Sequence, residues 1–216
     1  MFKYISALFL ILGLSASGLA AEKSNGSLQS ISKKYRAAKL VEMTVQKTVK
    51  LELQGRETKY DGKIFLSSGK FRWENETPEK TLLVFDGTTI WSIQYPPKEF
   101  GGDPQIARGK VDKKTRSQIL ISSLLGGDLQ KNFKVTSEKT DGDVATLEVS
   151  PIGNDLMIKS MSLVIDTKKV LLQEVSYKDD IGNLTKMKFS DIKFKSSSKN
   201  SLFKYQPPKG AQVTNL

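Results

Sequence analysis

The residue types that most enzyme chemistry needs are missing from this chain. It contains no cysteine and no histidine, so it lacks a thiolate nucleophile, the usual general base and the commonest metal ligand. The pair Ser67-Ser68 has no histidine to activate it, and the carboxylates, lysines and tyrosines form no recognisable catalytic motif. We therefore expect no catalytic residue, no cofactor and no metal site; an esterase that uses Ser67 or Ser68 as its nucleophile is the enzyme alternative.

Charge is the next chemical property that the sequence offers to a partner. Lys and Arg number 34 against 23 Asp and Glu, a formal net charge of +11. Such a charge favours anionic lipid headgroups or an acidic partner, or it is simply a solvated basic surface. The lysines are spread along the chain rather than clustered, so we expect no nucleic-acid partner.

The N-terminus is typical of a secretory signal peptide. Lys3 gives a positively charged start, residues 5–14 are almost continuously apolar, and small residues follow up to Ala21. The apolar run falls short of the roughly 20 residues that span a membrane. We expect cleavage after Ala20 or Ala21, which removes 1–21 and leaves 22–216 as a single domain in the periplasm; an uncleaved anchor is the alternative.

The first elements of that domain change from helical to strand periodicity. Apolar residues spaced by three and four predict a helix over 27–38, with Ser27 as its N-cap. From Met43 the period is two, and one face of the predicted strand carries valines and leucines. Lys47 interrupts that apolar row, so we expect it near an edge or pointing outward.

Hairpins follow at short intervals. Residues 63–66 and 70–74 flank one turn, and 81–85 and 88–93 flank Asp86-Gly87, a strong two-residue hairpin signal. That loop predicts Leu83 opposite Ile90 and Leu82 opposite Trp91. Both faces of this hairpin are then apolar, so the sheet needs cover on both sides.

The middle and the end of the chain contrast sharply. Residues 95–117, rich in Gly and Pro, predict a long connection, and 117–125 predict a short apolar helix that serves either as core or as a lid. Strands then return; we expect them at 133–137, 144–150, 158–166, 169–178 and 184–194. In the last of these strands the apolar phase shifts near Ser190-Asp191, which predicts a β-bulge.

Several separated motifs resemble, in order, those of the LolA family of periplasmic lipoprotein carriers. The front half contributes residues 62–66, Phe71-Arg72-Trp73-Glu74, Pro78, Asp86-Gly87 and Trp91. The back half contributes Leu124-Leu125, Phe133, Leu147, Val149, Pro151, residues 180–185, Phe203, Pro207-Pro208, Gly210 and Val213. Each motif is weak alone, but together they cover nearly all of the chain from Leu28 to Val213.

The resemblance implies a mainly β (α+β) fold. It is an incomplete antiparallel β-barrel of about eleven strands, with helices covering the concave opening. It implies a carrier, not an enzyme, that shelters the acyl chains of lipoproteins in an apolar cavity. The cargo would come from a LolCDE-type inner-membrane ABC transporter and pass to an outer-membrane acceptor such as LolB. We expect the carrier to be a monomer. The alternative function is an envelope-stress sensor or lipid-binding module of the same fold. Because the chain ends at Leu216, we expect no second sensor domain.

The resemblance also suggests where lipid binds. Phe71 and Trp73 match the aromatic pair of the strand that lines the family cavity, with Arg72 between them facing out. Alternation adds further cavity residues, for which plain core packing is the alternative: Val45, Val49, Leu51, Ile64 and Leu66. The lid-like helix contributes Ile121, Leu124 and Leu125.

One departure from the family concerns the closing of the lid. Family members commonly carry Arg-Pro ahead of the aromatic strand, where this chain has Ser67-Ser68. The hydrogen bonds that close the lid must therefore differ here. Arg72, Arg108, Arg116 or no residue at all could take the place of the missing arginine.

Overall fold

A computed structural model describes residues 18–111, 129–153 and 158–215 of the chain. The first half forms α1 (Gly18–Ala37), β1 (Leu40–Leu51), β2 (Arg56–Ser67), β3 (Lys70–Thr77), β4 (Thr81–Phe85), β5 (Thr89–Gln94) and β6 (Gln105–Lys110). The second half forms α4 (Leu129–Asn132), β7 (Phe133–Asp141), β8 (Val144–Pro151), β9 (Ile158–Asp166), β10 (Leu171–Asp179), β11 (Leu184–Lys195), the 3-10 helix η1 (Asn200–Phe203) and β12 (Val213–Asn215). Among these residues no helix is both long and apolar enough to cross a membrane.

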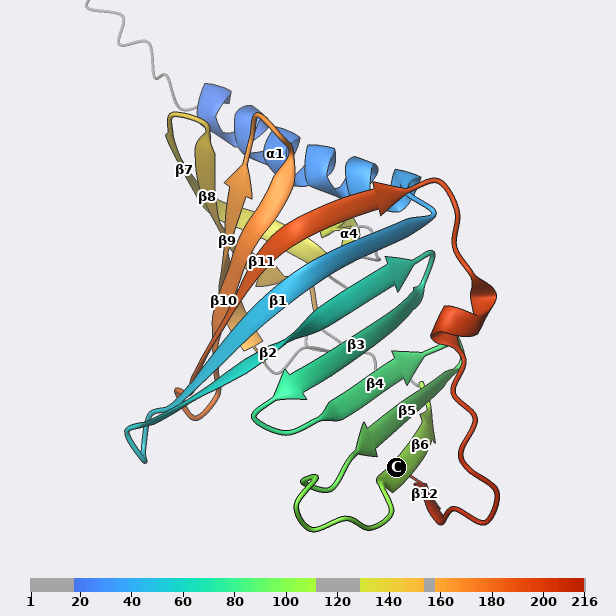
Figure 1. Ribbon diagram of the computed structural model, residues 1–216. Helices are drawn as coiled ribbons and strands as arrows, with labels where there is room; N and C mark the ends of the chain where they lie inside the picture. Colours follow the sequence, from blue (N-terminus) through green and yellow to red (C-terminus); the bar gives the residue numbers. More distant parts are fainter. Residues whose placement is uncertain (1–17, 112–128, 154–157, 216) are drawn as a thin grey trace, which may run out of the picture.

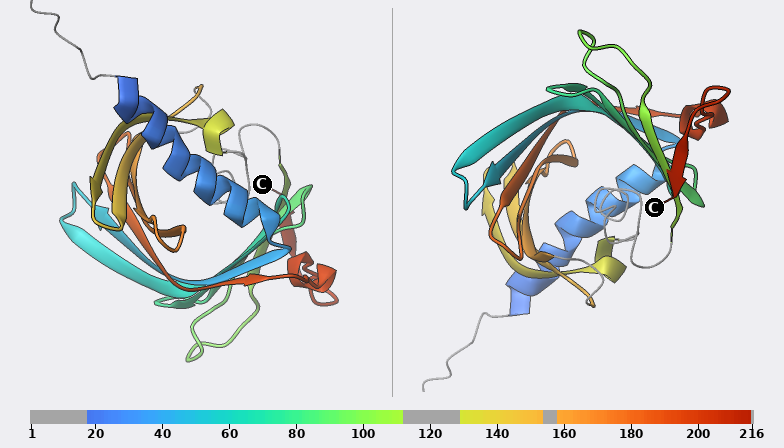
Figure 2. Two further views of the ribbon diagram at one scale, coloured as in Figure 1. Left: turned by 90° about the horizontal axis from the view of Figure 1, so that it is seen from above. Right: turned by 90° about the horizontal axis from the view of Figure 1, so that it is seen from below.

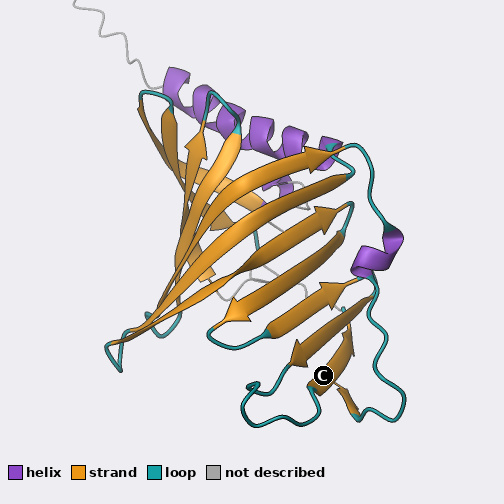
Figure 3. Ribbon diagram, viewed as in Figure 1, coloured by secondary structure: helices purple, strands orange, loops and turns teal. Residues whose placement is uncertain are grey.

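All of these strands belong to one curved sheet (Figures 1 and 3). Its order is β12-β6-β5-β4-β3-β2-β1-β11-β10-β9-β8-β7, so the described part of the chain forms an open sheet with β12 and β7 at its edges. Neighbouring strands are antiparallel except β12 and β6, which are parallel. The sheet has twelve strands, close to the expected number, and the incomplete barrel is confirmed.

The pairing of β1 with β11 joins the two halves of the chain. Val45 of β1 lies opposite Phe189 on β11 and opposite Gly62 on β2. Along β11 the register shifts, because Glu42 pairs with Lys193 but Thr44 pairs with Ser190. Asp191, in this bulge, adopts a φ of 51° and its carboxylate accepts a hydrogen bond from Thr44 Oγ1 at 3.1 Å. The predicted bulge is confirmed, and it keeps the apolar residues of β11 on one face.

Helix α1 crosses the concave side of the sheet (Figure 2). Leu28, Ile31 and Tyr35 share one face of the helix and are buried in the main core. The predicted helix over 27–38 is confirmed, but Ser27 does not cap it, because the helix begins at Gly18. Instead, Ser27 Oγ donates a hydrogen bond to Glu138 Oε1 on β7 at 3.0 Å.

Two further polar contacts fix α1 against the second half of the sheet. The backbone N–H of Leu172 donates to Tyr35 Oη at 3.2 Å, and Lys34 Nζ donates to the carbonyl of Lys169 at 2.6 Å. Burial raises the pKa of Tyr35 to about 12, although the hydrogen bond from Leu172 acts the other way. The helix is therefore held at one end of the concave face by packing and by hydrogen bonds.

The β4–β5 hairpin is apolar on both faces, as expected. Phe85 and Ile90 belong to the main core on the concave side. On the convex side a second cluster is buried under the C-terminal segment: Leu82, Val84, Ile93 and Ile106, with Tyr205, Ala211 and Val213 packed against them. The chain thus returns to cover the face that α1 leaves open.

The predicted register of this hairpin is wrong by two residues. Leu83 lies opposite Ser92, and Phe85 opposite Ile90. The cause is the Asp86 carboxylate, whose Oδ1 accepts hydrogen bonds from the N–H groups of Thr88 and Thr89 at 2.9 and 2.8 Å. Because the side chain of Asp86 organises a longer turn, the loop has more than the two residues expected.

Two other expectations fall in the middle of the chain. Residues 95–117 are not a continuous connection, because 105–110 form β6, which pairs with both β5 and β12. Pairing with the C-terminal strand is a long-range contact that local composition does not encode. The helix expected over 117–125 lies outside the described residues.

Candidate functional site

The predicted cavity residues share the concave face of β1, β2 and β3. Four of them are at most 3 % exposed and belong to the main core: Val45, Ile64, Leu66 and Phe71. Leu66 lies opposite Phe71, and Ile64 lies opposite Trp73. Alternation correctly predicts that these side chains share one face. The four buried residues also belong to the core that contains the apolar face of α1.

The other predicted residues lie beyond the main core or at its border. Trp73 is only partly buried, and Val49 and Leu51 are partly exposed near the far end of β1. Leu83 of β4, opposite Trp73, is a concave-face residue that the predicted register did not assign. Along β1, from Val45 toward Leu51, the concave face thus passes from a buried core to a partly exposed apolar surface.

Lys47 lies on this apolar surface, contrary to the expectation that it points outward or lies at an edge. It occupies the central strand β1, between Met187 of β11 and Tyr60 of β2. Its Nζ lies 5.2 Å from the centroid of the Tyr60 ring and 5.5 Å from that of Trp73. Burial lowers the pKa of Lys47, because desolvation disfavours the charged amine. The interruption of the apolar row in the sequence marks this residue, but the Lys47 side chain lies on the concave face and not on the outer one.

A second polar group on this surface has no partner in the part of the chain that the structure describes. Trp73 Nε1 is buried and makes no hydrogen bond to any described residue. Leaving a buried donor unpaired costs about 1–3 kcal/mol, and most native donors avoid that cost. The combination of an amine, two aromatic rings and an unpaired indole N–H therefore requires a functional or structural explanation.

Two of the arginines proposed as replacements for the missing lid arginine, Arg72 and Arg108, lie on the convex side of the sheet. Arg72 Nε donates to Glu74 Oε1 at 2.5 Å, and its Nη1 donates to the carbonyl of Leu202 at 3.3 Å, beneath η1. Arg108 lies opposite Trp91 on the convex side and contacts Asn215. Arg72 thus faces out as predicted. Arg116 and the lid residues Ile121, Leu124 and Leu125 lie outside the described residues.

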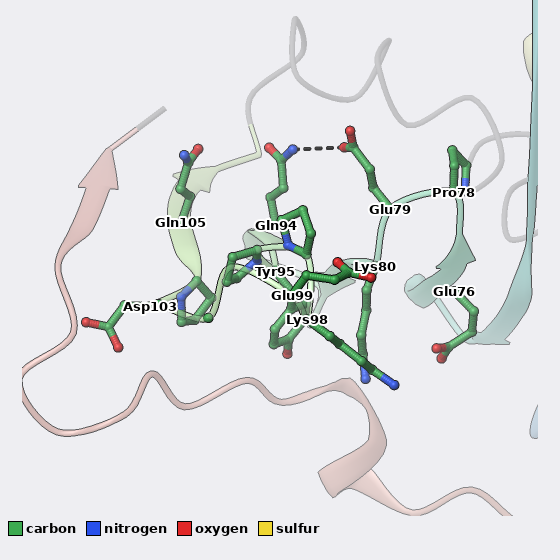
Figure 4. A pocket seen from close by; sticks show the side chains of 15 residues that line it. Glu76, Pro78, Glu79, Lys80, Gln94, Tyr95, Lys98, Glu99, Asp103 and Gln105 are labelled. Carbon is green, nitrogen blue, oxygen red and sulfur yellow. Dashed lines mark hydrogen bonds between the residues drawn. The ribbon is translucent and has the colours of Figure 1, made fainter.

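A pocket of about 730 Å³ lies between the β3–β4 and β5–β6 connections (Figure 4). Gln94 Nε2 donates to Glu79 Oε2 across it at 3.0 Å, and Lys80 Nζ lies 5.3 Å from the Tyr95 ring centroid. Glutamates, lysines and an aspartate line much of this pocket, and such charged groups do not suit a hydrocarbon chain. Within the described residues no group of three or more acidic side chains could hold a metal ion.

Comparisons with known proteins match this architecture. Residues 45–206 match the family model described as "Outer membrane lipoprotein carrier protein LolA". An outer-membrane lipoprotein carrier protein from Chromobacterium violaceum is 27% identical over 206 residues, covering 93% of each chain. One from Azotobacter vinelandii is 27% identical over 213 residues, covering 95% of this chain and 98% of its own.

A solved structure supports the fold alone. An uncharacterized conserved protein from Thermus thermophilus superposes with a TM-score of 0.53 at 14% identity. The match covers 89% of this chain and 99% of that chain. The curved sheet is therefore found in a solved structure of low sequence identity.

Proposed function

Because the chain belongs to the LolA family of outer membrane lipoprotein carrier proteins, we propose that it binds the acyl chains of lipoproteins and carries them to the outer membrane. The observation that carries this proposal is a curved sheet with an apolar concave face that α1 covers only in part. A carrier requires no catalytic group, in keeping with the absence of cysteine and histidine from the chain.

We assign the acyl chains to the partly exposed section of the concave face. Trp73, Leu83 and Val49 offer apolar surface there without α1 having to leave the sheet. Val45, Ile64, Leu66 and Phe71 form the floor of that surface and are the part shared with the core. Leu51 extends it along β1, and the lid residues of 117–125 remain a proposal from sequence.

The energetics favour a shallow and exchangeable site. Burying lipid yields about 0.8 kcal/mol per CH₂ group, so three chains of about sixteen carbons would gain more than roughly 30 kcal/mol against water. Non-covalent affinities rarely exceed about 20 kcal/mol. A carrier must release its cargo, so incomplete shielding of the chains is an advantage.

The family and the N-terminal sequence support a route for the cargo. We infer that residues 1–21 direct export and that the carrier works in the periplasm as a monomer. It would receive acylated lipoproteins from a LolCDE-type inner-membrane transporter and deliver them to an acceptor such as LolB. The alternative of a stress sensor or lipid-binding module of the same fold is less favoured, since the curated relatives are named as carriers.

The proposal is tested by comparing one lipoprotein in its acylated and non-acylated forms. The purified carrier should bind the acylated form and retain it through gel filtration, whereas the non-acylated form should elute separately. Equal binding of the two forms would exclude the concave face as an acyl site. Mass spectrometry of the carrier purified from the cell envelope should identify acylated proteins as its cargo.

A matched pair of leucine variants tests the location of the site. Leu83→Gln places an amide on the partly exposed apolar surface and should weaken acyl binding about tenfold, because an amide is costly to bury. Leu53→Gln is the control, since Leu53 is 87% exposed in the β1–β2 turn. Titration with an acylated peptide measures both; an equal effect in the two variants would place the site elsewhere.

A further inference from the structure

Lys47 is the one charged residue in the concave row of β1. The other members of that row are apolar: Val41, Met43, Val45, Val49 and Leu51. Lys47 has no hydrogen bond or ion pair to any described residue, and its contacts are the Tyr60 and Trp73 rings. These rings stabilise the ammonium group through their faces but leave its N–H groups without an acceptor.

The charged groups on neighbouring strands do not compensate Lys47. Asp61 of β2 accepts hydrogen bonds from Gln46 and Thr77, and Glu174 of β10 pairs with Lys186 at 3.1 Å. Strand alternation places Gln46 and Lys186 on the opposite face from Lys47. The concave face therefore presents a cation whose acceptor is not supplied by the described part of the protein.

Trp73 adds a second donor at the same place. Its indole Nε1 is buried without a partner among the described residues, while its ring contacts the Lys47 ammonium. Two donors that the described residues leave unsatisfied, within one apolar surface, fit a ligand that is apolar along its length and accepts hydrogen bonds at one end. Acyl chains have this chemistry, because their carbonyl oxygens lie at the head of the hydrocarbon.

We propose that Lys47 Nζ, assisted by Trp73 Nε1, binds the carbonyl oxygens at the head of an acyl chain and thereby sets how deeply the cargo enters the concave face. This inference rests on the proposed carrier function and makes it specific. The acyl head lies against Lys47, Tyr60 and Trp73, and the indole turns its N–H toward the entering oxygen. The hydrocarbon then extends over the partly exposed apolar surface around Leu83.

The acceptor oxygen has two possible sources, the ester or amide carbonyl of an acylated protein and the carboxylate of a free fatty acid. Three probes separate them: an acylated lipopeptide, a long-chain fatty acid, and an alkane of matched length that has no acceptor. Trp91 is the other tryptophan of the chain and lies on the convex side, against Tyr205. In a Trp91→Phe background, the fluorescence of Trp73 alone therefore reports binding.

Lys47→Met removes the cation and puts an unbranched apolar side chain in its place. It should weaken binding of the lipopeptide about tenfold, the value of one hydrogen bond to a charged group, and leave the alkane unchanged. Lys47→Arg should retain most of the affinity. Lys50→Met, at an exposed lysine three residues along β1, is the matched control and should bind like the parent.

The outcomes separate this inference from the carrier proposal. If Lys47→Met weakens binding of both the lipopeptide and the fatty acid, the polar site is supported with an acyl carbonyl as its ligand. If the variant weakens binding of the fatty acid alone, the site is supported with a free carboxylate as its ligand. If Lys47→Met binds all probes as tightly as the parent, or if its affinity for the alkane falls as much as its affinity for the lipopeptide, the polar site is excluded while the carrier function stands. If the parent binds no lipopeptide, both are excluded.

The indole N–H of Trp73 provides an independent readout that a purely structural role of Lys47 would not affect. In ¹⁵N-labelled protein, its proton resonance should move downfield with the lipopeptide and stay in place with the alkane. An unchanged resonance at saturating lipopeptide would remove Trp73 Nε1 from the site.

Discussion

At the scale of single residues, a charge on an apolar surface has opposite effects on binding and on stability. The pKa of Lys47 is lowered from its ordinary value of 10.5 because burial disfavours the protonated amine. The unfolded chain therefore binds this proton more tightly than the folded chain does. The resulting cost to folding is fully present below the folded pKa and is relieved as the pH rises from there toward 10.5.

Lys47→Met should consequently stabilise the protein. We expect the free energy of unfolding at pH 7 to rise by about 1 kcal/mol, which is a common gain for a single stabilising substitution. The advantage over the parent should shrink as the pH approaches 10.5. Urea denaturation of the variant and its parent at pH 7 and near pH 10.5 measures this difference. A variant less stable than its parent at pH 7 would show that the Lys47 side chain contributes more to packing than its charge costs.

At the scale of elements, the strands depend on a few positions where backbone or side chain sets the geometry. Between β2 and β3 the register shifts, because Asp61 pairs with Thr77 but Gly62 pairs with Asn75. A Cβ added to Gly62 would lie 2.1 Å from the carbonyl oxygen of Glu74. Glycine is thus required by the close approach of the two backbones, next to the strand that carries Trp73.

Gly62→Ala should therefore destabilise the β2–β3 pair. We expect a loss of about 3 kcal/mol in the free energy of unfolding, since backbone must shift to admit the methyl group. Gly26→Ala is the matched control, because nothing lies within 4 Å of its added Cβ. In the helix α1 this control should gain up to about 1 kcal/mol. Equal effects in thermal denaturation would contradict the steric explanation.

The β4–β5 turn depends on an ionised side chain. Burial opposes ionisation of Asp86, but hydrogen bonds from Thr89 and Thr88 outweigh it, and the pKa of Asp86 lies below its ordinary value of 3.8. A lowered carboxyl pKa contributes stability that is present above pH 3.8 and is lost as the pH falls through the folded value.

Asp86→Ala should cost about 1–2 kcal/mol at pH 7, because the turn loses its acceptor. Its deficit relative to the parent should decrease in acid as the parent's own carboxylate becomes protonated. Chemical denaturation at pH 7 and at about pH 3 tests this. A deficit that stays constant between the two would mean that the charge of Asp86 has no part in the turn.

At the scale of the whole molecule, two clusters on opposite faces of one sheet allow binding and stability to be separated. The convex cluster is covered by the C-terminal segment, and the concave one by α1. Because the proposed acyl surface lies beside α1 rather than beneath it, cargo should enter without detachment of the helix. The curved sheet then acts as a fixed platform during loading.

A tether between α1 and β7 tests this arrangement. Ser27 Oγ and Glu138 Oε1 lie 3.0 Å apart, and the chain has no cysteine of its own. The double variant Ser27→Cys, Glu138→Cys, joined by a short bismaleimide, should bind an acylated peptide as the untethered variant does. A loss of affinity of about tenfold or more on cross-linking would instead show that α1 must move to admit the cargo.

Much of the concave face was predictable from local pattern. Period-two alternation placed Val45, Ile64 and Phe71 on one face, and the shift of phase near Asp191 predicted the bulge that keeps β11 in register. These features depend on residues that are close in sequence, since successive strand side chains point to opposite faces. The Asp86 turn was predicted in place but not in length, because hydrogen bonds of the side chain compete with the shortest loop.

The sequence by itself determined the class of chemistry, the alternation of the strands and the family resemblance. Only the tertiary structure decided which face α1 covers, how β6 pairs with β12, and that Lys47 lies among aromatic rings on the concave face. Periodicity states which residues share a face but not what lies opposite that face. That depends on contacts between distant segments, and here the pairing of β1 with β11 and the return of the C-terminal segment supply them.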